Sequence, residues 1–280
     1  MSDKKKPAIY CDTHCHFDMP AFKEDFDAAV QRAVDAGLEF VIIPALDCTT
    51  AQNALGLARQ RPDFFYIAVG IHPTYTAEVD PSCLNQLTSL APQPGVVAIG
   101  EIGLDYYWDY ATPDQQKSVL LPQLELAGEV NLPLVIHNRD AEDDLGPILL
   151  KWQASLPAAH PLKTRPGVMH SYTGPQELAQ ELAEVGFYFG IGGPVTYKNG
   201  KDKQALVAML PHEKILLETD SPYLPPHPHR GKRNEPAYIP LIAAKVGEIW
   251  GMSAEEVGQI TTANAKHLFG IRKSPASQIS

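Results

Sequence analysis

A short apolar run, IYCDTHCH at residues 9–16, ends on a pair of histidines and opens a pattern that continues along the chain. Seven more runs rich in β-branched and aromatic residues follow it: FVIIPAL (40–46), FYIAVGIH (65–72), VVAIGEIG (96–103), LPLVIH (132–137), GVMHSY (167–172), FYFGIGG (187–193) and ILLETD (215–220). Longer amphipathic stretches separate these runs, an alternation that is typical of parallel βα units. Eight such units predict an α/β fold, a TIM-type (β/α)8 barrel that is either regular or distorted.

The stretches between the runs predict helices, and several end on a glycine, which helix C-termini favour. They include FDAAVQRAVDAG (26–37), TAQNALGLARQ (50–60), TPDQQKSVLLPQLELAGEV (112–130), DDLGPILLKWQA (143–154) and QELAQELAEVG (176–186). Residues 238–268 predict two C-terminal helices that close the barrel, and we expect residues 273–280 to fray. Residues 224–236 are interpreted as a long loop. We expect a single domain over residues 1–280, with its core at about 9–271.

The composition sets limits on location and partners. The chain is 44% hydrophobic and 20% charged, which is typical of a globular protein with a sizeable core. It has no apolar run of about 18 residues and no apolar signal region behind MSDKKK, so we expect a soluble, cytoplasmic monomer without membrane contact. Four cysteines without CxxC spacing are expected to be reduced. The net charge of −10 argues against a broad nucleic-acid-binding face but leaves room for a strand end or a small phosphoester.

Ionisable residues interrupt the predicted strands at their C-terminal ends, which converge on one face of a barrel. The six candidates for a metal site are His14, His16, Glu101, His137, His170 and Asp220. A single histidine at a strand end is more often an ordinary polar residue, but six such groups on one rim carry a high burial cost that a pair of divalent cations removes. Imidazole and carboxylate suit Zn, Mn, Fe, Co or Ni, whereas Mg prefers oxygen ligands, so the sequence leaves the identity of the metal open.

Three further residues are candidates for binding substrate. His72 lies on the same rim, where it either contacts a phosphate or positions the loop around Pro73. Arg139 and Arg233 offer the bidentate hydrogen bonds that suit a phosphate, and each has a structural ion pair as the alternative. For Arg139, with Asp140, Asp105 or Glu218 as partner, the structural alternative is favoured; for Arg233 the substrate contact is favoured.

Other polar and aromatic residues have two interpretations as well. Tyr106, Tyr107, Trp108 and Tyr110 either stack on the bases of a single strand or pack as a cover over the barrel mouth. Glu218 is interpreted as structural, with a partner. Lys198, Lys201 and Lys203 are interpreted as a solvated run rather than a positive rim. Cys11 and Cys15 are expected to pack between barrel and helices.

The chain resembles the TatD family of metal-dependent deoxyribonucleases, within the amidohydrolase-like barrels, from about residue 9 to about residue 271. The motifs that carry the resemblance are DTHCHFD (12–18), GIHP (70–73), AIGEIGLDYY (98–107), PLVIHNRDA (133–141), MHSYTG (169–174), LLETDSPYL (216–224) and RNEP (233–236). Some members lack the first histidine pair, so its presence here implies a complete site for two divalent ions, such as Mg, Mn or Zn.

The resemblance also implies roles for the six candidates. His14, His16 and Asp220 would hold one metal, His137 and His170 the second, and Glu101 would bridge them. Asp220 and Glu101 are then the catalytic residues, with Asp220 as the general base. The implied activity is that of a 3′–5′ exonuclease on DNA, at single-stranded ends.

Two other classes of function stay open. An amidohydrolase, lactonase or phosphotriesterase would use the same metal site with different loops. The basic loop with Arg230, Lys232 and Arg233 favours an anionic substrate over these. A non-enzymatic scaffold with a degenerate site is disfavoured because all six candidate ligands are present.

Overall fold

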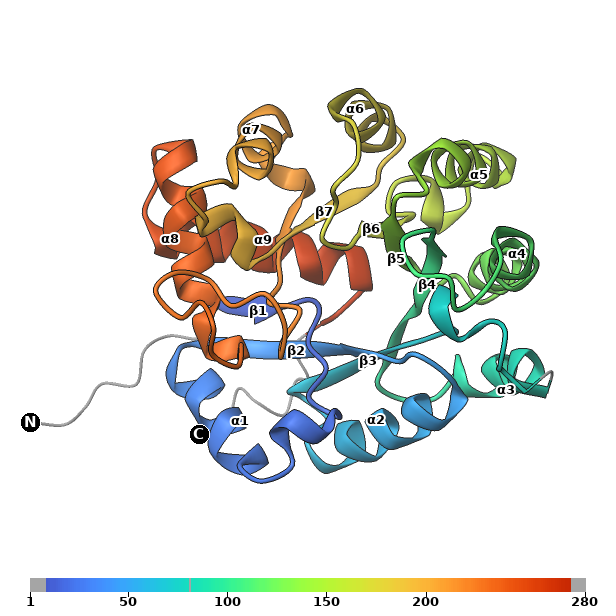
Figure 1. Ribbon diagram of the computed structural model, residues 1–280, viewed down its shortest axis with the longest axis horizontal. Coiled ribbons are helices and arrows are strands. Elements are labelled where there is room, and N and C mark those ends of the chain that lie inside the picture. Colours follow the sequence, from blue (N-terminus) through green and yellow to red (C-terminus); the bar gives the residue numbers. More distant parts are fainter. Residues whose placement is uncertain (1–8, 81, 273–280) are drawn as a thin grey trace, which may run out of the picture.

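The computed structural model describes residues 9–80 and 82–272, which form a barrel of eight parallel strands surrounded by helices (Figure 1). Each strand pairs in parallel with the next one along the chain. The strands are β1 (Tyr10–Asp12), β2 (Leu38–Pro44), β3 (Phe65–Val69), β4 (Val96–Asp105), β5 (Leu134–Arg139), β6 (Gly167–Met169), β7 (Tyr188–Ile191) and β8 (Ile215–Leu217). The prediction of an α/β barrel is confirmed.

The barrel closes between β1 and β8 through residues that follow both strands. The amide of Asp220 donates a hydrogen bond to the carbonyl of His14 at 2.8 Å, and the amide of His16 donates to the carbonyl of Ser221 at 2.9 Å. The first run is therefore a shorter strand than predicted, because β1 ends at Asp12 and both histidines lie beyond it. Their position next to β8 comes from these cross-links rather than from a continuous strand.

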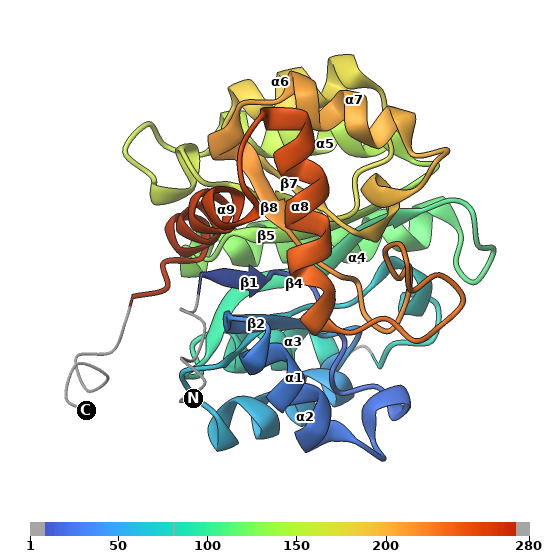
Figure 2. The same ribbon diagram turned by 90° about the vertical axis from the view of Figure 1, so that its left-hand side faces the viewer.

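Nine helices among the described residues surround the barrel. They are α1 (Phe26–Asp35), α2 (Cys48–Gln60), α3 (Ser82–Leu90), α4 (Pro113–Val130), α5 (Glu142–Ser155), α6 (Gln176–Glu184), α7 (Lys201–Met209), α8 (Ile239–Trp250) and α9 (Ala254–Phe269). The five helices named from sequence and the two C-terminal helices are present, and α9 packs against β1, β8 and α8 (Figure 2). Two helices were missed: α3 is short and largely polar, and α7 begins within the lysine run that was interpreted as surface.

Buried side chains form two apolar clusters. The larger one joins the strands to the surrounding helices and includes Cys15. The smaller one contains alternate strand residues such as Phe40 and Ile42, together with Cys11 and with Phe269 of α9. Cys15 thus packs where it was expected, whereas Cys11 pairs in register with Phe40 and lies with it in the smaller cluster.

The expectation of four reduced cysteines is wrong for one pair. Cys48 at the start of α2 and Cys83 in α3 form a disulfide, whereas Cys11 and Cys15 are free and buried. The two partners are 35 residues apart, so no local spacing signals the pair; the packing of α2 beside α3 brings their Cα atoms to 5.8 Å, within reach of a disulfide. No helix among the described residues is long and apolar enough to cross a membrane.

Candidate metal centre

The six predicted ligands converge at the C-terminal end of the barrel. Glu101 lies in β4 and His137 in β5, while the other four residues follow β1, β6 and β8. Glu101 is central, because its Oε2 lies 3.2 Å from Nε2 of His14 and its Oε1 lies 2.9 Å from Nδ1 of His137. On the side of β8, Oδ1 of Asp220 lies 3.6 Å from Nε2 of His16. His170 completes the group, with its ring stacked on that of His14 at 3.5 Å between centroids.

Two glycines allow Glu101 to occupy its central position. A Cβ on Gly100 would lie 2.5 Å from Cβ of Val135, and a Cβ on Gly103 would lie 1.9 Å from the carbonyl oxygen of His137. Gly103 also has a φ of +149°, a conformation that side-chain-bearing residues rarely adopt. The GEIG segment therefore needs both glycines for β4 to lie close against β5, which puts the Glu101 carboxylate next to His137.

The donor atoms fit a metal ion. Three sets of side chains have ligand atoms within 4.8 Å of one another: His14, His16 and Asp220; His72, Glu101 and His137; and His14, His170 and Glu218. Both ring nitrogens of His14 and Nδ1 of His16 are buried without a hydrogen bond. A buried polar atom without a partner costs about 1–3 kcal/mol, and a cation bound to the unprotonated nitrogen of each ring would offset part of that cost.

These sets include His72, which the sequence analysis treats as a substrate-binding residue and not as a metal ligand. The set of His14, His16 and Asp220 is the one that the resemblance gives to one metal. In the second set, His72 stands beside Glu101 and His137, with its Nε2 3.5 Å from Oε1 of Glu101. The GIHP motif places His72 on the rim, so the signal for a metal ligand was present in the sequence.

Burial and neighbouring charges set the ionisation of the cluster. Burial lowers the pKa of His16 to about 3, with a further contribution from His14, so its imidazole is neutral and able to bind a metal. Burial alone would raise the pKa of Glu101, but the nearby histidines outweigh it and hold this pKa well below its usual range. For Asp220, burial is the largest cause and leaves its pKa above the ordinary value.

Two carboxylates outside the predicted set orient the histidines. Oδ2 of Asp105 lies 2.8 Å from Nε2 of His137, and Oε1 of Glu218 lies 3.0 Å from Nδ1 of His170. A carboxylate partner of this kind fixes which nitrogen of an imidazole faces the metal. Glu218 thus has the partner that its structural interpretation requires. The role of Asp105 was missed, because it was considered only as a partner of Arg139.

The predicted substrate-binding residues have different surroundings. His72 accepts a hydrogen bond on Nδ1 from the amide of Thr74 at 3.2 Å, so it also positions the following turn. Arg139 makes none of the proposed ion pairs; its guanidinium lies 3.7 Å from the ring centroid of Tyr107. Arg233 donates to both carboxylate oxygens of Asp25, at 2.6 and 2.8 Å, which favours its structural alternative.

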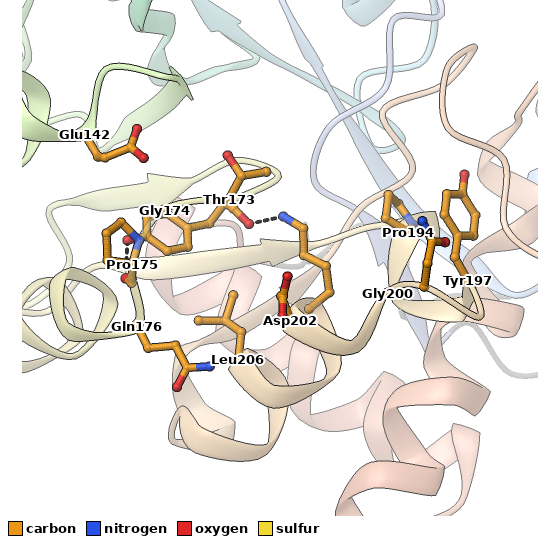
Figure 3. Close-up of a pocket in the computed structure, with 13 residues that line it drawn as sticks. Glu142, Thr173, Gly174, Pro175, Gln176, Pro194, Tyr197, Gly200, Asp202 and Leu206 are labelled. Carbon is orange, nitrogen blue, oxygen red and sulfur yellow. Dashed lines mark hydrogen bonds between the residues drawn. The ribbon is translucent and has the colours of Figure 1, made fainter.

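A cavity of about 560 Å³ opens on the same rim, between the loops that follow β6 and β7 and the start of α7. Figure 3 shows Thr173 and Pro175 on one side of it and Pro194 and Tyr197 on the other. None of the six predicted metal ligands is among its lining residues.

Lys203 also lines this cavity. Its Nζ donates to the carbonyl of Ser171 at 3.1 Å and to the carbonyl of Tyr172, and burial lowers its pKa to about 8. The interpretation of this lysine as part of a solvated surface run is therefore wrong.

A parallel eight-stranded barrel with candidate imidazole and carboxylate ligands at its C-terminal rim is typical of metal-dependent hydrolases. The family model of the TatD-related DNases matches residues 11–270. The chain belongs to this family, and it is an enzyme that acts on ester bonds.

Three similar proteins illustrate the relationship. The uncharacterized metal-dependent hydrolase YabD of Bacillus subtilis is 40% identical over 260 residues, which cover 93% of this chain and 98% of YabD. The 3′–5′ ssDNA/RNA exonuclease TatD of Shigella flexneri is 37% identical over 255 residues, or 89% of this chain and 95% of its own. The crystal structure of YjjV, a TatD homologue from Escherichia coli, has a TM-score of 0.86 at 34% identity, covering 95% of this chain and 99% of that one.

The Asp105–His137 pair yields a test of the metal centre. Asp105→Asn removes the acceptor that orients His137, and we expect the dissociation constant for a divalent metal to rise about 10- to 100-fold. Competition with a chelator measures this constant. Asp144→Asn on α5, which alters an exposed partner of Tyr106 instead, is the matched control and should leave it unchanged. Equal affinities for Asp105→Asn and the control would show that Asp105 does not support the metal.

Proposed function

We propose that this enzyme is a two-metal nuclease that removes nucleotides from the 3′ ends of single-stranded DNA. His14, His16 and Asp220 would hold one ion and His137 and His170 the second, with Glu101 shared. The observation that carries the two-metal part is the placement of Glu101, whose two oxygens face different histidines, His14 on one side and His137 on the other.

Charge balance supports a pair of ions. Four carboxylates meet at the rim: Glu101, Asp105, Glu218 and Asp220. Burial lowers the pKa of His170, but Glu218 and Glu101 outweigh it and raise this pKa to about 10, so a protonated His170 offsets one of these charges. When all four are ionised, their charge equals that of two divalent cations. Without cations, burial of so many like charges would cost several kcal/mol per group.

The bound ions and the side chain of Asp220 would have different roles in the reaction. Bound divalent ions would supply charge stabilisation for the phosphate oxygens and would acidify the attacking water. Asp220 is the candidate general base, because its side chain is 17% exposed while Glu101, Asp105 and Glu218 are almost fully buried. Its raised pKa favours proton uptake, and solvent reaches it directly. The cavity between the loops that follow β6 and β7 opens on the same rim, and its volume of about 560 Å³ is of the size that small ligands occupy.

Two findings bear on the choice of substrate. The TatD of Shigella flexneri carries the name of a 3′–5′ ssDNA/RNA exonuclease, and this name supports the proposed polarity and strand preference. Against that, Arg233 is paired with Asp25, so the loop after β8 offers one cation fewer than its sequence suggests. A small amide, lactone or phosphotriester is the alternative substrate class.

Asp220→Asn tests the general base. The amide is similar in size but does not take up a proton, so we expect kcat on a phosphodiester to fall about 100-fold or more while the fold is retained. Steady-state kinetics and circular dichroism measure the two effects. Asp35→Asn, which alters an exposed acceptor of Gln31 at the end of α1, is the control and should keep full activity. A variant that retains more than about a tenth of the wild-type kcat would refute the assignment.

The products of an oligonucleotide assay test the proposed activity. A single-stranded DNA labelled at its 5′ end should shorten stepwise, and a phosphorothioate linkage at its 3′ terminus should block the reaction, because attack begins at that end. A fully paired, blunt duplex should react more slowly. Shortening from the 5′ end would exclude the polarity, and hydrolysis of lactones or amides without any cleavage of DNA would exclude the nuclease.

A further inference from the structure

We propose that Tyr107, Trp108 and Tyr110 form a surface on which unpaired bases of the substrate strand stack, with Arg139 as the accompanying cation. This inference rests on the proposed function and adds to it a binding element outside the metal centre. We refer to these three rings as the aromatic platform.

Exposed rings are concentrated on one end of the barrel. Among the described residues, the exposed large aromatic side chains are Tyr75, Tyr107, Trp108, Tyr110 and Tyr223. All of them lie in segments that follow β3, β4 or β8, at the end where the metal ligands converge. Exposed apolar side chains that gather in one place indicate a binding surface, whereas scattered ones do not.

A single carboxylate connects the aromatic platform to the metal centre. Oδ1 of Asp105 accepts hydrogen bonds from the amides of Tyr107 and Trp108, each at 3.1 Å. Oδ2 of the same side chain lies 2.8 Å from Nε2 of His137. The start of the platform is therefore fixed relative to a metal-ligand candidate, and a strand bound at the centre passes close to these rings.

Two of the three rings are nearly parallel, while Tyr107 is perpendicular to Trp108 and carries the cation on its face. Trp108 and Tyr110 are nearly parallel, at 22° and 5.7 Å between centroids, and the guanidinium of Arg139 covers one face of Tyr107. Tyr106, the neighbour in sequence, differs from them: its hydroxyl donates to Asp144 and its ring packs against the core. Tyr106 thus anchors the loop, while the three following rings face solvent.

The chemistry of these groups selects an unpaired strand. The face of a base is free for stacking only when the base has left the duplex, and stacking on aromatic side chains occurs with any base. Arg139 suits the phosphates between stacked bases, and a cation over a ring adds to the attraction. The net charge of −10 disfavours duplex binding, because that mode depends on many Lys and Arg contacts to phosphates.

Tryptophan fluorescence gives a direct test of contact. The chain has three tryptophans, and the indoles of Trp152 and Trp250 donate to backbone carbonyls of Leu124 and Val207. Titration of the metal-loaded protein with a phosphorothioate oligothymidylate should quench the emission. The quenching should persist in Trp152→Phe and disappear in Trp108→Phe. Absence of quenching, or equal quenching by a blunt duplex, would overturn the proposal.

Kinetics separates stacking from catalysis. Trp108→Ala and Tyr110→Ala should each raise KM for single-stranded DNA about 10-fold with kcat unchanged, while Trp108→Phe restores KM because it restores a ring. The hydrolysis of methyl p-nitrophenyl phosphate, which is too small to reach the rings, should not change. Leu121→Ala is the matched control, since Leu121 on α4 is 47% exposed and Trp108 is 43% exposed.

The outcomes distinguish the two proposals. Unchanged KM for single-stranded DNA in both alanine variants would overturn the aromatic platform and leave the nuclease intact. Quenching by the oligothymidylate in a protein that hydrolyses neither phosphodiester would support the platform and overturn the nuclease.

Discussion

The structure depends on a single electrostatic constraint: carboxylates and imidazoles are gathered at one end of a closed barrel, where water cannot solvate all of them. Glu101 lies between His14 and His137, and hydrogen bonds from surrounding groups do not satisfy every buried nitrogen. Such a cluster is stable only if other charges compensate it. Divalent cations would provide that compensation, and the proposed phosphodiester hydrolysis would use the same cations.

The fold meets this constraint through two close approaches between strands. The glycines on either side of Glu101 let β4 approach β5 closely, and the hydrogen bonds between the ends of β1 and β8 place His14 and His16 opposite Asp220. Asp105 then links the centre to the loop that carries the exposed rings. Metal binding and the proposed strand binding therefore share one carboxylate, so the geometry of the centre and of the aromatic platform are coupled.

Much of this arrangement can be predicted from the sequence, because it follows local rules. Alternation of apolar runs with amphipathic stretches gives the barrel, and the strand ends give the six ligands, which the structure brings together. Three of the failures concern contacts between residues that are distant in sequence. Arg233 is paired with Asp25, which is 208 residues away, and Cys48 is paired with Cys83 across two helices. Burial of Lys203 likewise depends on carbonyls from another loop, which no local pattern reveals.

The most direct test of the central proposal is anomalous diffraction from crystals of the protein reconstituted with Mn²⁺ or Zn²⁺. We expect two anomalous peaks about 3.5–4 Å apart, one beside His14 and His16 and one beside His137 and His170, with one oxygen of Glu101 next to each ion. A single peak, or two peaks that share no contact with Glu101, would contradict the account.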